Sequence, residues 1–327
     1  MFCLLLIILL VSICYEANAQ HVTLMELNCE NAFDLRHDEG KNDFEYVDGG
    51  TRHWNNGKLY RKLDGVAKII AAVDSVQPVG IVGLCEVEND SVLEYLTKRT
   101  VLRSMGYEYI VTESEDSRGI DVAMLYSALV FRPFEKECIR PKHVGSATRD
   151  ILRVAGVMKR DTLDVYIVHL PSKLGGKEGK LKASQILRGL KMNVDSIMAC
   201  RRDAKIIVMG DMNSELNSEM FRKDLPVERF WKSNEKGLLD GTALYDVIEE
   251  KAGKAFGTYK YRGVWSVIDH IFVTGNMNVV ESGILSSSYI VEKDDKYGGI
   301  KPKRTYIGYR YNGGISDHLP VWVRIGL

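Results

Sequence analysis

Polar residues that could bind a metal ion or transfer protons recur beside apolar runs in this sequence. Asp211 and Asn213 follow the run "KIIVMG", and Glu86 closes the run "VGIVGLC". The other members of the set are Asn28, Glu30, His169, Asp269, His270, Asp317 and His318. Such runs are typical of buried strands, and strand ends on one edge of a sheet lie close together. We therefore predict that these side chains meet at one edge of a layered sheet protein.

Carboxylates, carboxamides and histidines gathered in this way could form a metal site, a general acid–base site, or both. Mg²⁺ and similar hard cations take oxygen ligands, keep several waters and use a substrate phosphate as a further ligand. The oxygen donors in the set are Glu86, Glu30, Asp317, Asp211, Asn28 and Asn213. The sequence holds no Cys–His grouping with the spacing of a zinc site. The pattern therefore indicates a hard cation.

Each residue also has a structural explanation when it is taken alone. An Asp or Asn after a strand is commonly a turn former or a helix cap, and Asp211 and Asn213 could be only that. Glu86 could simply begin a loop, and His169 could be a hydrogen-bonded structural histidine. We interpret His270 as structural, because it points to the opposite face of its strand from the preceding residue. The functional hypothesis depends on the joint pattern, which independent caps would rarely produce.

Strand-like and helix-like segments alternate along the chain. We predict strands over 21–28, 79–86, 107–112, 120–127, 128–134, 151–159, 163–170, 204–210, 265–274, 279–285 and 319–327, and helices over 58–73, 91–98 and 179–200. The second helix begins with a Ser91 cap and has Glu94 three residues on. The one long irregular segment is 292–318, and loops of that length tend to be functional. Many strands and few helices predict an α/β protein with two central sheets and flanking helices in one domain.

Residues 1–19 have the features of a secretory signal peptide. An apolar run is followed by Ala17-Asn18-Ala19, a small-x-small ending that suits signal peptidase. The run is too short for a comfortable membrane span, and a short N-terminal anchor is the alternative interpretation. No later run is long enough to cross a bilayer. We expect a mature domain over 20–327 without stable membrane insertion, in a secreted or periplasmic location.

Charge and cysteine content argue against some classes of protein. The 44 Lys and Arg residues balance the 44 Asp and Glu residues. This balance argues against the wholesale phosphate neutralisation of a DNA-packaging protein, although it leaves room for a local basic groove. The mature chain keeps Cys29, Cys85, Cys138 and Cys200, whose spacing matches no zinc pattern. We predict that they are mostly buried small hydrophobic residues rather than disulfides.

The motifs resemble, in order, those of the endonuclease/exonuclease/phosphatase superfamily, which includes deoxyribonuclease I. The resemblance covers almost the whole mature chain, and it suggests a secreted bacterial member. It is carried by "LNCENAFD" with Asn28 and Glu30, "GLCEVEN" with Glu86, "SRGIDVAMLY" with Arg118, "YIVHLPSKLGG" with His169, "VMGDMNSEL" with Asp211 and Asn213, "SVIDHIFV" with Asp269, and "ISDHLPV" with Asp317 and His318.

The resemblance implies a four-layer α/β sandwich, in which two mixed β-sheets pack face to face with helices outside. It also implies phosphoester hydrolysis with Mg²⁺ or Mn²⁺ at one edge of the sheets. The implied roles are metal binding by Glu86, Asn28, Glu30 and Asp317, phosphate contact by Arg118 and Asn28, and catalysis by His169, Asp211, Asn213, Asp269 and His318. Asp211 and Asn213 would position and activate the attacking water, and whether Asp211 or His318 is the base stays open.

Three departures separate the sequence from particular members of that superfamily. The Tyr that several nuclease members place near the phosphate has no obvious counterpart, since Tyr126 lies inside a predicted strand. His270 stands where the inositol phosphatases usually have Arg. No insertion resembles the abasic-site recognition loops.

The leading functional hypothesis is a divalent-metal-dependent nuclease acting on nucleic acid. Two basic, aromatic segments, 52–62 and 296–311, could hold phosphates with Lys and Arg and stack Tyr and Trp on bases, although both could be ordinary solvated loops. The alternative is a phosphatase or phosphodiesterase on a small or lipid substrate, such as sphingomyelin or a sugar phosphate. A binding module without catalysis is disfavoured because the whole set of site residues is present.

Overall fold

The computed structural model describes residues 21–74, 76–141, 148–172, 175–248 and 256–326. The predicted signal peptide, 1–19, lies outside these residues. Within them, no helix is both long and apolar enough to cross a membrane.

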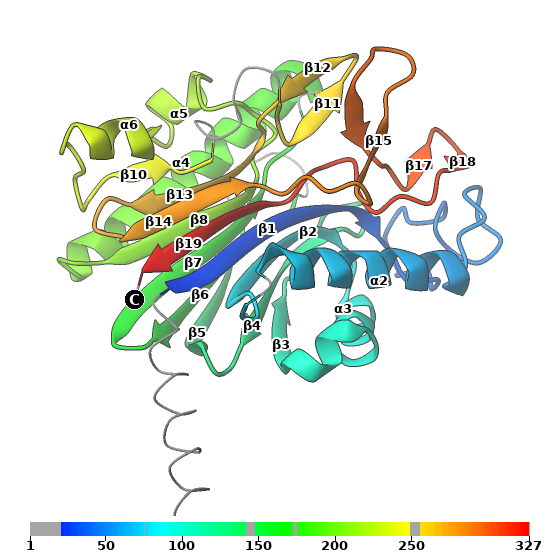
Figure 1. The fold of residues 1–327 in the computed structure, drawn as a ribbon, viewed down its shortest axis with the longest axis horizontal. Helices are drawn as coiled ribbons and strands as arrows, with labels where there is room; N and C mark the ends of the chain where they lie inside the picture. The colour runs from blue at the N-terminus through cyan, green and yellow to red at the C-terminus, as the bar shows by residue number, and fades with distance from the viewer. Residues whose placement is uncertain (1–20, 75, 142–147, 173–174, 249–255, 327) are drawn as a thin grey trace, which may run out of the picture.

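Two mixed β-sheets form the centre of the molecule (Figure 1). Among the described residues, the first sheet has the strand order β14 (Val279–Ile284), β19 (Val321–Gly326), β1 (His21–Ala32), β2 (Ile81–Val87), β4 (Asp121–Ser127) and β3 (Tyr107–Val111). The second has the order β5 (Phe131–Ile139), β6 (Ile151–Met158), β7 (Asp161–His169), β8 (Lys205–Asp211), β13 (Asp269–Thr274), β10 (Leu244–Asp246) and β9 (Val227–Arg229).

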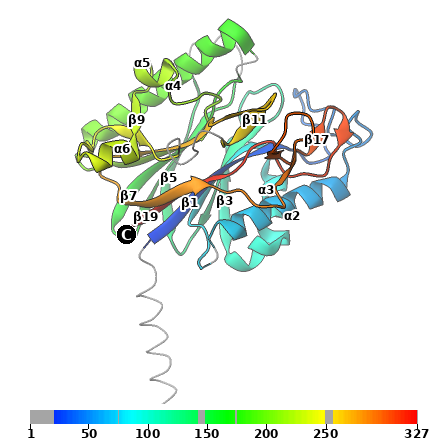
Figure 2. The same cartoon turned by 45° about the horizontal axis from the view of Figure 1, so that its top comes forward.

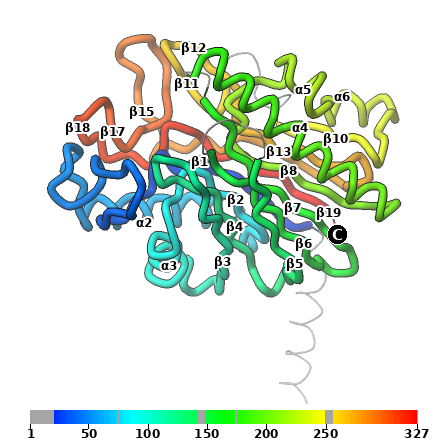
Figure 3. The backbone as a smooth tube through the Cα atoms, turned by 180° about the vertical axis from the view of Figure 1, so that it is seen from behind, coloured from blue at the N-terminus to red at the C-terminus, as the bar shows by residue number. Residues whose placement is uncertain are grey.

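Helices cover the outer faces of the two sheets. Apolar residues of α2 (Asn56–Val73), α3 (Asp90–Arg99) and the 3₁₀-helix η1 (Val101–Met105) pack on the outer face of the first sheet. Those of α4 (Gly176–Cys200) and α5 (Met220–Lys223) pack on the second sheet, and α6 (Phe230–Glu235) lies beside β9. Figures 2 and 3 show α2 and α3 on one side of the molecule and α4 on the other. The predicted four-layer sandwich is confirmed.

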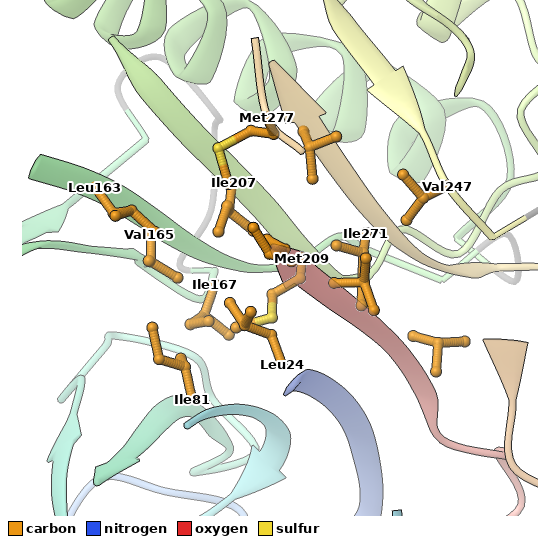
Figure 4. Packing of buried hydrophobic residues seen from close by; sticks show 14 of the residues in the cluster. Leu24, Ile81, Leu163, Val165, Ile167, Ile207, Met209, Val247, Ile271 and Met277 are labelled. Atoms are coloured by element: carbon orange, nitrogen blue, oxygen red, sulfur yellow. The ribbon is translucent and has the colours of Figure 1, made fainter. Parts of the chain in front are cut away.

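The main hydrophobic core lies between the two sheets (Figure 4). Leu24 and Ile81 of the first sheet face Ile167, Ile207 and Met209 of the second, and all five are fully buried. Because β1 is covered by α2 on one side and by the second sheet on the other, it is buried along 22–29 on both faces. The polar residues Thr23 and Glu26 of this strand are therefore buried as well.

The register of the strands places the predicted site residues side by side. In the second sheet, β7 pairs with β8 so that His169 lies opposite Asp211, and β8 pairs with β13 so that Asp211 lies opposite Asp269. In the first sheet, Asn28 of β1 lies opposite Cys85, the residue before Glu86. These ends therefore lie at the same edge, as the sequence predicts.

Three predicted segments differ from the structure. The cap of α3 is Asn89, whose side chain accepts hydrogen bonds from the Ser91 and Val92 amides, so Ser91 is inside the helix. The segment 292–318 is not irregular, because it contains two hairpins. In the first, β15 (Val291–Lys293) pairs with β16 (Ile300–Pro302), and in the second, β17 (Tyr306–Ile307) pairs with β18 (Arg310–Tyr311). Glycines with positive φ allow the turns of both hairpins. The strand predicted over 265–274 is divided between β12 (Val264–Ser266), which pairs with β11 (Tyr259–Tyr261), and β13.

The cysteine prediction holds for two of the four residues. Cys29 and Cys85 are buried and free, whereas Cys138 and Cys200 are free and exposed. Cys138 is exposed because β5 is the edge strand of the second sheet, and Cys200 because it ends α4.

Candidate active site

The carboxylate of Asp211 lies at the centre of the site. Its Oδ2 accepts hydrogen bonds from Asn28 Nδ2 at 3.0 Å and from Asn213 Nδ2 at 3.1 Å, and its Oδ1 accepts one from the Asn213 amide at 2.8 Å. Asn213 Nδ2 also donates to the Leu170 carbonyl at 3.0 Å. The two residues at the end of β8 therefore form one fixed unit, and Asn28 connects that unit to the first sheet.

Two histidines face the same carboxylate. His318 Nε2 lies 4.0 Å from Asp211 Oδ2, and His318 Nδ1 lies 2.8 Å from an Asp269 carboxylate oxygen. His169 Nε2 lies 3.6 Å from Asp211 Oδ2 and 3.8 Å from Glu86 Oε1. One nitrogen atom of His169 therefore lies within 4 Å of both Glu86 and Asp211, so the predicted convergence of the two sheets' strand ends is confirmed.

Two further carboxylates lie beyond His318. Asp317 Oδ1 is 3.8 Å from His318 Nε2, and Asp317 Oδ2 pairs with the guanidinium of Arg304. Glu30 Oε2 accepts a hydrogen bond from the Thr305 amide at 2.6 Å. The hairpin segment after β16 therefore contacts the acidic end of β1.

Bulges aim several of these side chains at the site. Glu30, Asn31, Glu86 and Asn213 have φ values of 49°, 61°, 59° and 49°. The pairing of β1 with β2, and of β2 with β4, shifts register near the first three. The Asn31 amide donates to Glu86 Oε2 at 3.0 Å, which links the two bulges. Bulges and left-handed residues of this kind cluster at functional sites, where they redirect side chains.

The surroundings of His318 favour its protonated form. Burial would lower the pKa of His318, but Asp269 and Asp211 outweigh burial and hold it well above the ordinary value. Because Nδ1 is directed at Asp269, the proton on Nε2 points toward Asp211 and the pocket. His318 is therefore a charged hydrogen-bond donor near neutral pH.

The pKa values of Asp211 and His169 are shifted in opposite directions. Burial raises the pKa of Asp211 to about 7, against the opposing charge of His318. Burial, followed by the charges of Arg149 and Arg118, lowers the pKa of His169 well below its ordinary value. The site thus combines a carboxyl group that titrates near neutral pH with a neutral imidazole.

A pocket of about 720 Å³ opens over these groups. The predicted site residues that line it are Glu30, Glu86, Arg118, His169, Asp211, Asn213, Asp317 and His318. Asn28 and Asp269 are buried behind its wall, 1% and 0% exposed. Asn28 therefore bonds Asp211 from behind rather than from within the pocket.

His270 does not reach the pocket. It is fully buried, with Nδ1 3.1 Å from Asp246 Oδ2 and Nε2 3.0 Å from the Ser214 carbonyl. Both ring nitrogens are thus engaged inside the second sheet, which supports its interpretation as a structural residue.

A comparison with protein families decides the assignment. The sequence model described as "Endonuclease/Exonuclease/phosphatase family" matches residues 23–326. The chain belongs to this family. A search of curated proteins found no match. Because the chain belongs to this family, it is a phosphoester hydrolase of the nuclease or phosphatase kind.

Solved structures share the fold at low sequence identity. Truncated Caenorhabditis elegans TDP2 has a TM-score of 0.60 and 18% identity, over 94% of this chain and 98% of that chain. D. rerio TDP2 complexed with a single-strand DNA product has a TM-score of 0.56 and 16% identity, over 94% and 99%. A mannosyl-6-phosphatase from Bacteroides thetaiotaomicron has a TM-score of 0.56 and 16% identity, over 94% and 100%. At these identities the likeness shows the fold alone.

Members of this family typically depend on a divalent metal ion, and the donors of the pocket suit one. Glu86, Glu30 and Asp317 present carboxylate oxygens, the ligands that hard cations take. Burial and the neighbouring Asp317 raise the pKa of Glu30 to about 7. Ligand atoms of Asp211, Asp269 and His318 also lie within 4.8 Å of one another, although Asp269 is already bonded to His318. The residues present fit a divalent ion.

Arg149 lines the pocket and was not among the predicted site residues. Arg149 is 7% exposed, pairs with Asp116 at 2.9 Å and donates to the Leu170 carbonyl at 2.8 Å. Asp116 also accepts a hydrogen bond from the Arg118 amide at 2.9 Å. Arg149 thus fixes the turn that carries Arg118, whose Nη1 lies 4.0 Å from Glu86. No motif marks Arg149, because it precedes β6 in a segment without periodicity.

A buried lysine was also missed. Lys62 of α2 is 1% exposed, and its Nζ donates to Thr305 Oγ1 at 2.6 Å and to the Ile315 carbonyl at 2.8 Å. The signal was available, since Lys62 shares the helix face of Leu59 and Val66, which are buried. A lysine on an apolar helix face needs a partner, and here the partners come from the segment before β19.

The two predicted basic, aromatic segments meet at the rim of the pocket. Arg52 lies 5.2 Å from the ring centroid of Tyr46, 5.1 Å from that of Tyr306 and 5.5 Å from that of Tyr309. On another part of the lining, the Tyr259 ring lies 4.9 Å from the imidazole of His318. Tyrosines therefore do lie beside the site, although Tyr126 is not one of the lining residues.

Proposed function

We propose that this family member cleaves phosphodiester bonds of nucleic acid by metal-assisted attack of water, with Mg²⁺ or Mn²⁺. The observation that carries this proposal is a second hollow of about 700 Å³ beside the active-site pocket. The two share Ser172 and Asn213 in their linings. Two neighbouring hollows, one of them over the reactive carboxylate, suit a strand with phosphates on both sides of the bond that is cut.

The walls of the pocket support the same substrate class. Lys and Arg side chains bind backbone phosphates, and exposed Tyr rings stack on bases. Arg52, Arg118 and Arg149 line the pocket, and Tyr261 on the β11–β12 hairpin lines it with 55% of its surface exposed. The D. rerio TDP2 structure, which holds a single-strand DNA product on this fold, adds support.

Asp211 is the proposed general base. A pKa of about 7 suits a group that must accept a proton from water near neutral pH. His318 does not suit that role, because Asp269 and Asp211 keep it protonated. Asn213 and Asn28 both donate to Asp211 Oδ2, and they hold the carboxylate in one orientation.

The remaining residues would stabilise negative charge on the phosphate. His318 Nε2 and neutral His169 are donors on two sides of Asp211, and Arg118 lies beside Glu86. Glu86 is the proposed main metal ligand, and Glu30 and Asp317 are the other carboxylates of the predicted metal set that line the pocket. A bound divalent ion would polarise a phosphoryl oxygen and neutralise charge on the leaving oxygen.

We also propose that the chain is exported to a secreted or periplasmic location, because residues 1–19 have the features of a signal peptide.

The first test is digestion of single-stranded and plasmid DNA by the mature protein, with Mg²⁺ or Mn²⁺ and with EDTA. We expect cleavage that EDTA abolishes, and loss of cleavage in Asp211→Asn. Tyr261→Ala should raise KM for DNA. Phe134→Ala, which removes a similarly exposed aromatic ring on β5, should not. No cleavage of DNA or RNA with any divalent ion would reject the nuclease proposal.

A phosphatase on a small phosphoester is the second candidate. The volume of the pocket, about 720 Å³, is in the range of small-molecule sites. The mannosyl-6-phosphatase among the structures with this fold supports it as well. Release of inorganic phosphate from sugar phosphates, with no nuclease activity, would favour this candidate.

A further inference from the structure

The acidic residues of the pocket fall into two groups. Glu86 contacts the Asn31 amide and lies near His169 and Arg118. Glu30 and Asp317 lie on the other side, where Arg304 faces both of them and His318 lies 3.8 Å from Asp317. The two groups of carboxylates therefore differ in the cationic side chains that lie beside them.

Arg304 lies between the two carboxylates of the second group. Its Nη2 pairs with Asp317 Oδ2, and its Nε is 3.8 Å from Glu30 Oε1. The other Glu30 oxygen is occupied by the Thr305 amide at 2.6 Å, next to Arg304 in the chain. Arg304 Nε is buried and has no hydrogen-bond partner among the described residues. The guanidinium thus occupies the position that a cation shared by Glu30 and Asp317 would take.

Lys62 adds a second positive charge behind the same group. Its amino group is buried and donates only to neutral oxygens of Thr305 and Ile315 in the described contacts. Burial lowers the pKa of Lys62 below its ordinary value, and the negative charges that oppose this shift include Glu30 and Asp317. Since a buried ammonium needs compensating charge, Lys62 and these two carboxylates stabilise one another.

A substrate contact is a less suitable role for Arg304. A guanidinium that binds phosphate needs free donors directed at the ligand, and here Nη2 and Nε are directed at carboxylates. Arg118 is the more available phosphate ligand, because its contacts with carboxylates are longer, 4.0 Å to Glu86 and 3.7 Å to Asp116.

We propose that Arg304, supported by Lys62, is a built-in counter-cation that replaces a second divalent ion at Glu30 and Asp317. The protein then binds one divalent ion, on the side of Glu86. This inference rests on the proposed metal-dependent reaction and narrows its ligand set. It also predicts a folded, charge-balanced site when no divalent ion is present.

Calorimetric titration of Mn²⁺ into the EDTA-stripped mature protein tests the proposal. We expect one ion per chain for the unmodified protein. We expect the same for the control Lys303→Gln, which removes one positive charge at the position next to Arg304. Arg304→Gln should bind two ions, should melt at a lower temperature than the unmodified protein in EDTA, and should gain more from added Mn²⁺. Two ions on the unmodified protein, or one ion with unchanged melting for Arg304→Gln, would overturn the proposal.

Asp317→Asn provides a test that does not depend on Arg304 variants folding. If Arg304 is the counter-cation, Asp317→Asn should keep one Mn²⁺ per chain with nearly unchanged affinity. A marked loss of Mn²⁺ affinity would instead make Asp317 a ligand and contradict the inference. If the unmodified protein binds no Mn²⁺ at all, the proposed metal-dependent function itself fails, and this outcome is separate from the others.

Discussion

At the scale of the residue, chemically identical groups behave differently because their surroundings differ. Burial raises the pKa of Asp211 to about 7, whereas His318 and Arg304 overcome the effect of burial and lower the pKa of Asp317. Glu26, on β1 behind the site, is 0% exposed, and burial and Asp269 raise its pKa well above the ordinary value. Asp211 is thus suited to proton transfer, Asp317 to staying charged and Glu26 to staying neutral.

The pair of His318 and Asp269 gives a prediction of pH dependence. Because the pKa of His318 is raised, its protonated form is present below that pKa and is lost as pH rises through it. Asp269→Asn removes the strongest opposing charge, so the alkaline limb of the kcat profile should move to lower pH. We also expect kcat to fall by roughly 10²- to 10⁴-fold, with KM little changed.

The matched control is Asp246→Asn, which alters the other buried histidine pair, with His270. This variant should lower stability without moving the alkaline limb. The role proposed for His318 is wrong if the pH–rate profile of Asp269→Asn superimposes on that of the unmodified protein.

At the scale of the element, the register of three strands builds most of the site. His169, Asp211 and Asp269 are direct neighbours across β7, β8 and β13. Gly210 makes this register possible, since its φ is +150° and an added Cβ would lie 1.8 Å from the Val168 carbonyl oxygen. The glycine before Asp211 is therefore a requirement of strand packing as well as part of a motif.

Gly210→Ala should destabilise the protein by about 3 kcal/mol or more, because the backbone of β7 or β8 must move. Gly189→Ala is the control, as Gly189 lies in α4 with nothing within 4 Å of its added Cβ. It should stabilise by about 0.5–1 kcal/mol, since Ala favours a helix over Gly. Urea unfolding measures both, and equal stabilities for the two variants would contradict this account.

At the scale of the whole molecule, the site couples the two sheets. Asn28 and Glu86 come from the first sheet, while His169, Asp211 and Asp269 come from the second. The hydrophobic core between the sheets holds the two sets in contact. An ion that binds only this folded arrangement stabilises the native state by mass action.

Mn²⁺ should therefore raise the melting temperature, by an amount that corresponds to about 2.7 kcal/mol when the free ion is 100 times its Kd. Glu86→Gln should remove most of this increase and most of the activity, while its melting temperature in EDTA stays close to that of the unmodified protein. An undiminished Mn²⁺ effect in Glu86→Gln would show that the ion binds elsewhere.

Short local patterns in the sequence were sufficient to predict the layers, most strands and the residues that gather at one sheet edge. The buried strands that precede Asp211, Asn213 and Glu86 could be predicted because each is formed by consecutive apolar residues, which a local pattern shows. The cap of α3, the hairpins within 292–318 and the exposure of Cys138 were predicted wrongly, because small differences in turn geometry and strand order decide them.

The sequence by itself thus determined which acids, amides and histidines the site contains and the order in which strands deliver them. Only the tertiary structure placed Arg304 between Glu30 and Asp317, and Lys62 behind them. It also decided that Asp211 titrates near neutral pH while His318 stays charged. The physical reason is that charge pairing and burial depend on side chains far apart in sequence, such as Asn28 and Asp211, 183 residues apart. No local pattern records the distance between such groups.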